Sequence, residues 1–183
     1  MTLKEKIQTD LKTAVKEKNE TFISALRLLL AAILNKEKAK RYKISQEKSD
    51  LVDEAKASSS PFAEARVTEE ELVKESQLTD EEVIEVISSE IKKNKEAIVD
   101  FEKGEREDLV KKEKAAIEVW QKYLPEQFSD QELKKLAKEA IEKIGAKEAK
   151  DMGRVMTELM PQIKGKAEGS QVSKIVKELL EIR

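Results

Sequence analysis

The chain has 183 residues, of which 39% are hydrophobic and 4% aromatic, with only five Gly and three Pro, a composition typical of long solvated helices rather than of a β-sandwich or barrel. Charged residues make up 40% of the chain but leave a formal net charge of only −2, so any contact with nucleic acid must depend on a local basic patch. Cysteine and histidine are both absent, which excludes disulfides, thiolate nucleophiles, Cys/His zinc sites and imidazole acid/base chemistry.

The first 44 residues, which hold 11 basic and 5 acidic side chains, predict two helices. Apolar residues recur at helical spacing over residues 3–15, behind Thr2 as a candidate N-cap and before Asn19 as a candidate stop. Residues 22–34 are apolar almost all round the helix, and such a pattern predicts a helix that neighbours bury on several sides.

Arg27 is the only charged residue of that second helix. Because an unpaired charge in an apolar setting is costly, we expect Arg27 to pair with an acid, for which Glu90 and Asp100 are candidates. The alternative is a cation that projects toward an interface or a phosphate. The basic cluster of residues 36–43 is interpreted as the solvated end of the helix, where cations complement the macrodipole.

No membrane segment or signal peptide is expected. The longest apolar run, residues 28–34, is far too short to span a bilayer. Met1 is followed by Lys4, Glu5 and Lys6 rather than by the apolar segment of a signal peptide. These features predict a cytoplasmic protein that does not engage membranes.

The apolar pattern weakens over residues 45–78, where the chain also becomes acidic. The run from Ser58 to Pro61 interrupts any helical pattern, so we interpret residues 45–78 as an insertion or mobile connector. Short helices are possible within it at residues 51–55 and 69–75, the second behind Thr68 as N-cap.

Two helices are predicted next. Thr79 and Glu82 form a capping box that opens a long helix, and Gly104 ends it. Its apolar face consists of Val83, Ile84, Ile87, Ile91 and Ile98. The following helix stops at Pro125, which lacks an N–H and clashes with the preceding turn, so a domain boundary is expected there.

A small second unit is predicted after this boundary. Ser129 and Glu132 repeat the capping-box pattern, and Gly145 closes that helix. Further helices are expected over residues 151–160 and from Ser170, as N-cap, through Leu180, with a loop over residues 161–169 between them. The predicted fold is all-α, with a bundle of about four helices in residues 1–125 and a three-helix domain in residues 126–183.

Four stretches of this sequence resemble the GatB/YqeY-like family, whose members are similar to the tail of GatB, a component of the glutamine-dependent tRNA amidotransferase. Their order and spacing follow the family pattern except at residues 45–77, where the connector is longer. The third stretch is Tyr-Leu-Pro-Glu-Gln, and the fourth, with its Met-Gly-basic-Val-Met and basic-Gly-basic-Ala patterns, is the most specific. The stretches cover residues 26–33, 78–83, 123–127 and 152–169.

The resemblance implies an all-helical tail that, in the amidotransferase, helps to hold the body of the tRNA while catalysis takes place in other domains. The Gly/Ser-rich core for glutamine hydrolysis and the ATP and Mg²⁺ cradle for phosphorylation are not visible in this sequence. We therefore predict no catalytic residue, no cofactor and no metal site.

The candidate RNA-binding residues lie in and near the loop at residues 161–169. Lys164, Gly165, Lys166 and Gly169 form a short basic loop, in which Gly permits close approach to a phosphate backbone. Lys150 and Arg154, about one helical turn apart, are expected to extend this patch. A solvated turn without a ligand is the alternative interpretation.

Three other features favour structural roles. Met152, Met156 and Met160 are spaced by four and are expected to fill core gaps along one helix face. Trp120 and Tyr123 are expected to pack at the junction between the two domains rather than to stack on bases. The acids at residues 80–82 are explained by capping and by the helix dipole.

The leading hypothesis is an accessory module that contacts tRNA or a tRNA-modifying or aminoacylation enzyme. One alternative is a protein-interaction domain without RNA, and a second is a carbon–nitrogen ligase activity that uses glutamine as amido-N donor. RNA binding through phosphates weakens steeply with salt, whereas a mostly apolar protein interface does not. Glutamine or ATP turnover by the pure protein would support the ligase alternative.

Overall fold

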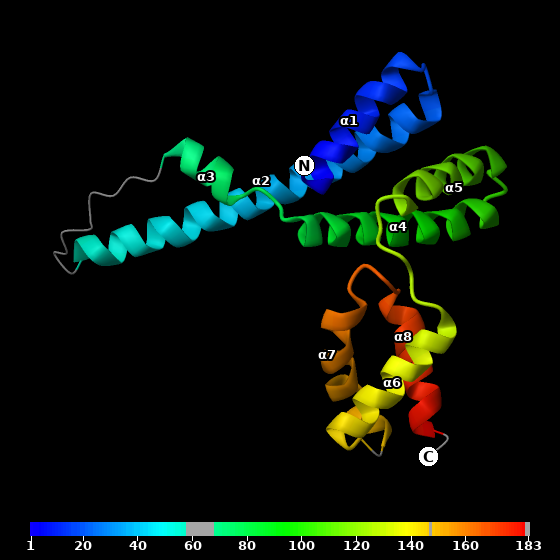
Figure 1. Cartoon of the computed structure of the whole chain (residues 1–183). Helices are drawn as coiled ribbons and strands as arrows, with labels where there is room; N and C mark the ends of the chain where they lie inside the picture. The colour runs from blue at the N-terminus through cyan, green and yellow to red at the C-terminus, as the bar shows by residue number, and fades with distance from the viewer. Residues whose placement is uncertain (58–67, 147, 182–183) are drawn as a thin grey trace. The chain divides into compact units, whose positions relative to one another are not determined.

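A computed structural model describes residues 1–57, 68–146 and 148–181, and the side chains of these residues except at 50–57 and 149 (Figure 1). All regular structure in these residues is helical, which confirms the predicted all-α class. The helices are α1 (Leu3–Lys16), α2 (Glu20–Ala57), α3 (Glu69–Glu75), α4 (Asp80–Lys103), α5 (Glu107–Gln121), α6 (Asp130–Ile144), the 3₁₀ turn η2 (Ala149–Asp151), α7 (Met152–Ile163) and α8 (Gly169–Glu181).

The chain divides into two compact units, an N-terminal unit Met1–Trp120 and a C-terminal unit Gln121–Arg183. The N-terminal unit holds α1 to α5, one short helix more than the four that were predicted. The C-terminal unit holds α6 to α8, as expected, together with η2.

Local capping sets where four helices begin. In each case the hydroxyl of a Ser or Thr accepts the backbone N–H three residues later, and a Glu at that position accepts the N–H of the cap residue in return. The pairs are Thr2 with Glu5, Thr68 with Glu71, Thr79 with Glu82, and Ser129 with Glu132. All four N-caps predicted from the sequence at these positions are therefore confirmed.

The core of the N-terminal unit comes from one face of each of its long helices. The buried side chains of α4 follow the predicted face closely, although Val86 replaces Ile84 among the fully covered positions. Trp120 of α5 is 2% exposed, and its Nε1 donates to the carbonyl oxygen of Ala25 on α2 at 2.9 Å. The remaining buried apolar residues of α1 and α2 are Ile7, Ala14, Ile23, Leu26, Leu29 and Ile33.

The prediction that α2 is buried on several sides is wrong. Only one of its faces is buried, whereas Leu28 is 59% exposed and Arg27 is exposed beside it. Arg27 therefore needs no internal partner, and the two candidate acids are engaged elsewhere, Glu90 with Lys93 and Asp100 with Lys103. The apolar pattern overestimated the burial of α2, because a helix that packs on one side can still expose leucines on the other.

The end of α2 was also predicted too early. The helix does not stop at its basic cluster but runs through the first part of the expected connector to Ala57. Lys, Gln, Glu and Ala have high helix propensity, so this polar stretch can stay helical without a wide apolar face. Within the same segment, α3 covers the second predicted short helix at residues 69–75. The run from Ser58 to Pro61 lies outside the described residues.

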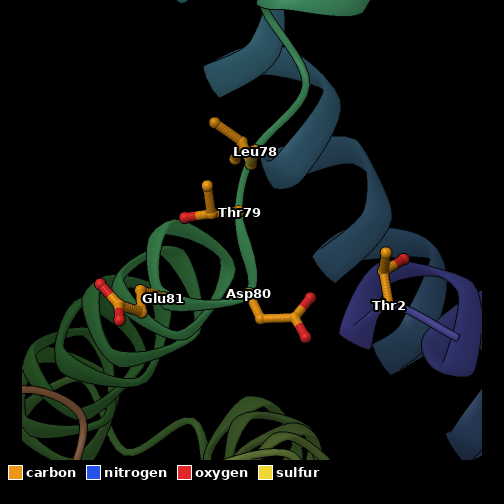
Figure 2. A pocket seen from close by; sticks show the side chains of 5 residues that line it. All are labelled: Thr2, Leu78, Thr79, Asp80 and Glu81. Carbon is orange, nitrogen blue, oxygen red and sulfur yellow. The ribbon is translucent and has the colours of Figure 1, made fainter.

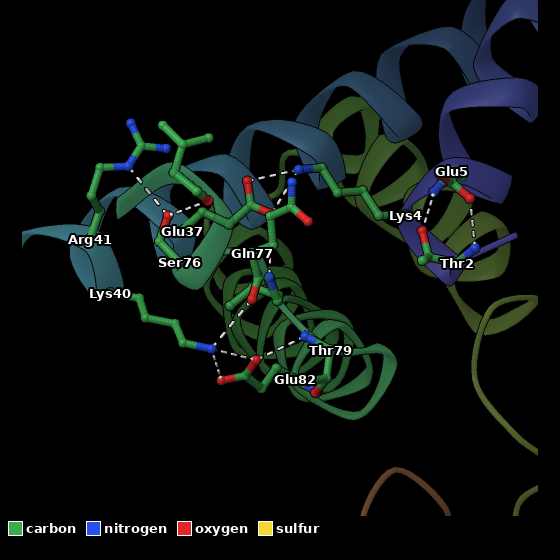
Figure 3. Close-up of polar contacts among 12 residues, drawn as sticks. Thr2, Lys4, Glu5, Glu37, Lys40, Arg41, Ser76, Gln77, Thr79 and Glu82 are labelled. Carbon is green, nitrogen blue, oxygen red and sulfur yellow. Dashed lines mark hydrogen bonds and ion pairs between the residues drawn. The ribbon is translucent and has the colours of Figure 1, made fainter. Parts of the chain in front are cut away.

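Polar contacts with α2 anchor the chain where it returns into α4 (Figure 3). Glu37 is 4% exposed and accepts both a bidentate bond from Lys4 Nζ, at 2.7 and 2.8 Å, and a long bond from the Leu78 N–H, at 3.5 Å. One turn later, Lys40 Nζ pairs with Glu82 at 2.8 Å and donates to Gln77 O at 3.4 Å. Three residues of α2 thus hold the segment 76–79, since Arg41 Nε also donates to the buried Ser76 Oγ at 3.3 Å.

The C-terminal unit forms a separate three-helix core. Its buried residues line α6, α7 and α8, and Gly145, with a φ of 69°, ends α6 in the left-handed conformation that was expected of a C-terminal Gly. Of the three methionines, Met152 and Met156 pack against this core, but Met160 is 48% exposed. The buried stripe of α7 is instead Val155, Leu159 and Ile163.

Two boundaries in the C-terminal unit differ from the predicted ones. Pro161 does not end α7, which continues to Ile163. The last turn holds because Ile163 is buried and its carbonyl accepts the N–H groups of Lys166 and Ala167. Ser170 is not the N-cap of α8, because Glu168 O already accepts the N–H of Gln171.

Among the described residues, no helix is both long and apolar enough to cross a membrane.

Acid should weaken the fold through the capping glutamates. Hydrogen bonds lower the pKa of Glu82, first from Lys40 and then from the Thr79 N–H, and the N–H groups of Thr68 and Ser129 likewise lower the pKa of Glu71 and Glu132. The unfolded chain therefore takes up protons first, so stability is fully present above the ordinary glutamate pKa of 4.5 and is lost as the pH falls below it.

We expect the urea midpoint to drop as the pH is lowered from about 6 to about 3, and Glu82→Gln to flatten part of that drop. The glutamine keeps an acceptor for the Thr79 N–H but removes the titrating group beside Lys40. Urea titrations followed by circular dichroism at several pH values measure this. Glu118→Gln, which changes an exposed glutamate, serves as the control. If both variants flattened the drop equally, Glu82 would not be the source of the pH dependence.

Candidate nucleic-acid interface

The basic loop between α7 and α8 is a defined turn. Lys164 has φ −54° and ψ 118°, Gly165 has φ 74°, and the Lys166 N–H donates to Ile163 O at 2.8 Å. These values describe a type II turn, whose second central residue must adopt a positive φ, so Gly is required there. The Lys-Gly-Lys pattern is thus first a turn motif that places a lysine on each side of the glycine.

The segment before α6 braces this turn, which sequence reasoning did not anticipate. Gln127 Nε2 donates to Gly165 O at 2.8 Å and to Pro125 O at 2.8 Å, and the Phe128 N–H donates to Lys166 O at 2.9 Å. Two successive carbonyls of the turn are therefore held by residues about 38 positions earlier. Gln127 is the last residue of the Tyr-Leu-Pro-Glu-Gln stretch. The sequence pattern therefore singled out Gln127 but did not show that it bonds to Gly165.

The two lysines of the turn differ in their surroundings. Lys164 is exposed, whereas Lys166 is half-buried and its Nζ lies over the ring of Phe128, 5.2 Å from the centroid. Glu168 follows within two residues, so the turn carries a local net charge of only +1. A phosphate contact at this turn would therefore be weak by itself.

Gly169 opens α8, at the positive end of that helix's dipole. A Cβ built on Gly169 would meet no atom within 4 Å, and the first turn of α8 contains no acidic residue. The helix start therefore has space at Gly169 and adds a favourable partial charge, but two acids lie beside it: Glu168 directly before the helix and Asp130, whose carboxylate accepts from Gln171 Nε2 at 2.6 Å.

Lys150 and Arg154 do not extend the basic turn, contrary to expectation. Lys150 lies in η2 and Arg154 in the first turn of α7, whereas the basic turn follows the end of α7, about 15 Å away along the helix axis for the ten residues from Arg154 to Lys164. Each also faces a nearby acid, Lys150 with Glu148 at 2.8 Å and Arg154 with Asp151 at 3.6 Å. The structure thus brings Lys164, Gly165, Lys166 and Gly169 together and leaves the other two apart.

The aromatic residues near Pro125 are not available to stack on bases. Trp120 lies in the core of the N-terminal unit, and Tyr123 is buried as well. The basic cluster of residues 36–43 is only in part a solvated helix end, because Lys40 and Arg41 hold the segment before α4.

A shallow hollow lies at the start of α4 and is lined by Thr2, Leu78, Thr79, Asp80 and Glu81 (Figure 2). The Asp80 carboxylate accepts the Leu3 N–H at 2.8 Å, so this acid caps α1 as well as complementing the dipole of α4. The capping interpretation of the acidic run is confirmed for Glu82, whereas Asp80 caps α1 rather than its own helix. Within the described residues, no three acidic side chains are grouped so that they could hold a metal ion.

Comparison with known proteins gives the chain relatives over most of its length. A family described as "Yqey-like protein" matches residues 51–180. "Altered inheritance of mitochondria protein 41, mitochondrial" from Pyrenophora tritici-repentis is 30% identical over 179 residues, which cover 96% of this chain and 79% of that protein. An uncharacterized protein of Schizosaccharomyces pombe is 44% identical over 52 residues, 28% of this chain and 42% of the other. The family match includes the braced turn and all of α8 but its last residue.

Proposed function

The chain belongs to the YqeY-like family, and from this premise we propose that it is an accessory module that contacts tRNA, or an enzyme that handles tRNA, through the braced turn at Lys164–Gly169. The observation that carries the proposal is the turn itself. Its backbone geometry and the two bracing carbonyl contacts hold Lys164 and Lys166 on either side of Gly165, directly before α8. The likeness to the tail of GatB supports tRNA as the ligand.

The compartment is part of the proposal. The sequence predicts the cytoplasm, and the name of the fungal relative refers to mitochondria. Both compartments contain tRNA, so neither location argues against the proposed ligand.

Two other functions compete with this one. A protein-interaction domain would bind its partner through apolar contacts and show little dependence on salt. A glutamine-dependent ligase would hydrolyse glutamine or ATP, and a rate above that of a buffer control with pure protein would favour it over the module.

Charge reversal in the turn should weaken tRNA binding. For Lys164→Glu with Lys166→Glu, loss of two phosphate contacts is expected to lower the slope of log K against log salt by about 1.4 on single-stranded regions and about 1.8 on duplex. Fluorescence anisotropy with tRNA at several salt concentrations measures this. Circular dichroism on the same samples separates contact loss from unfolding.

The matched control reverses the same number of charges in η2 and the first turn of α7, in Lys150→Glu with Arg154→Glu. Because those residues lie apart from the turn and face acids, we expect their variant to retain most of the binding. Equal losses in both variants would indicate non-specific attraction. Wild-type protein that shows no salt-sensitive binding, while pull-downs recover a protein partner, would replace the proposal with the interaction domain.

A third arm tests the module in its expected context. The chain, with and without the two substitutions in the turn, replaces the resembling tail of an intact amidotransferase. A rise in the Kd for tRNA with the substituted turn would support the proposal even where the free module binds too weakly to measure.

A further inference from the structure

The outward surface of α2 carries only positive charge over residues 21–46. This stretch contains six basic residues and a single acid, Glu37. Glu37 is buried, and Lys4 from α1 neutralises it through both carboxylate oxygens. The fold thus removes from the surface the one negative charge that the sequence places among the cations.

Three of the six cations form no ion pair with the part of the chain that the structure describes. Lys40 and Arg41 are engaged with the segment before α4, and Lys43 lies at 3.9 Å from Glu47 with both side chains exposed. The remaining three are Arg27, Lys36 and Lys38.

Two of these cations share one helix face with an exposed aromatic ring. Arg27, Ala31, Lys38 and Tyr42 follow each other at intervals of four, seven and four residues, which places them along one stripe of α2. Tyr42 is 66% exposed, and its hydroxyl accepts a bond from Gln46 Nε2, one turn later, at 2.8 Å. We call these four residues the α2 stripe.

The stripe has the composition of a surface that holds single-stranded nucleic acid. Such surfaces combine cations that follow the phosphates with aromatic rings on which bases stack. Lys38 and Tyr42 are one helical turn, about 6 Å, apart, so a phosphate and a neighbouring base can be engaged together. Leu28 and Leu34 are exposed on the two sides of the stripe and offer apolar surface to the faces of further bases.

We propose that the α2 stripe is a second RNA-binding surface, which takes a single-stranded segment with Tyr42 stacked on a base and Arg27 and Lys38 on phosphates. The inference rests on the proposed function, because it takes RNA as the ligand of the α2 stripe as well as of the braced turn. It uses other residues, however, in the other compact unit of the chain. A protein helix with acidic flanks is the competing occupant.

The test uses the full chain and a labelled, mixed-sequence RNA of about 12 nucleotides, long enough to span one such binding surface. Tyr42→Leu should weaken binding at least fivefold, because a stacked base contributes about 1–3 kcal/mol. Tyr42→Phe keeps the ring and should bind like wild type. Arg27→Gln with Lys38→Gln should lower the salt slope by about 1.4.

The matched control is Lys111→Gln with Lys112→Gln, which removes two exposed charges from α5 of the same unit and should leave the affinity unchanged. Equal affinities of wild type and Tyr42→Leu would overturn the proposal, as would a wild type that does not bind the RNA. An unchanged affinity of Tyr42→Leu for RNA, combined with loss of a captured protein partner, would assign the stripe to that partner.

The outcome separates the two proposals. Lys164→Glu with Lys166→Glu should leave binding of the short RNA largely intact if the stripe is a site of its own. Loss of tRNA binding in that variant alone, with no effect of the α2 substitutions, would support the turn and reject the stripe. The converse result would support the stripe and reject the turn.

Discussion

Replacing Trp120 with alanine is expected to destabilise the protein by about 3–5 kcal/mol, the range found when large buried side chains are truncated. The indole is 2% exposed and joins α5 to α2 through the bond to Ala25 O. A cavity of this size removes dispersion contacts around it as well as the buried apolar area. Because domains are stable by only about 5–15 kcal/mol, the loss is a large share of the total.

Urea unfolding followed by far-UV circular dichroism measures this effect, since the substitution removes the chain's one tryptophan. Trp120→Phe separates the two contributions, because it fills much of the space but cannot donate to Ala25 O. We expect an intermediate loss for Trp120→Phe. An alanine variant within about 1 kcal/mol of wild type, the size of one ordinary hydrogen bond, would show that the ring contributes no packing.

The second large effect concerns the buried ion pair. Glu37→Ala should cost about 3 kcal/mol, because it leaves Lys4 Nζ and the Leu78 N–H without their acceptor. This value is the low end of the range of about 3–5 kcal/mol for breaking a buried ion pair, since the Lys4 side chain is 29% exposed and can turn toward water. The same variant should speed hydrogen exchange at the Leu78 amide, which reports on the anchored segment 76–79 directly.

A double-mutant cycle tests whether the pair is coupled. Lys4→Met alone leaves a buried carboxylate and should be costly, whereas Lys4→Met with Glu37→Leu replaces both charges by apolar groups and should recover much of the stability. Thermal and urea unfolding of the four proteins provide the coupling energy. Strictly additive losses would mean that the two side chains act independently in spite of the 2.7 Å contact.

Features with short-range causes could be predicted from the sequence. A capping box needs only a hydroxyl and a carboxylate three residues apart, so Thr79 with Glu82 and Ser129 with Glu132 are recognisable from the sequence alone. The left-handed conformation of Gly145 at the end of α6 could also be predicted, because a Gly just after a helix commonly adopts it. The buried face of α4 followed from its apolar periodicity.

Features that depend on distant partners could not be predicted. The burial of Glu37 requires Lys4, 33 residues earlier, and nothing in the run of lysines around it distinguishes the one acid that turns inward. The brace on the turn requires Gln127, 38 residues from Gly165. Lys150 and Arg154 were grouped with the turn because they are near it in sequence, but the length of α7 separates them from it.

The brace on the turn also limits the length of chain between the two compact units. Since Gln127 and Phe128 are bonded to the turn and Pro125 O accepts from Gln127, at most residues 121–124 join the N-terminal unit to the braced segment. Four residues span at most about 14 Å when fully extended. Residues 121–124 are therefore the place where added Gly and Ser residues would lengthen the chain between the two units without altering either proposed surface.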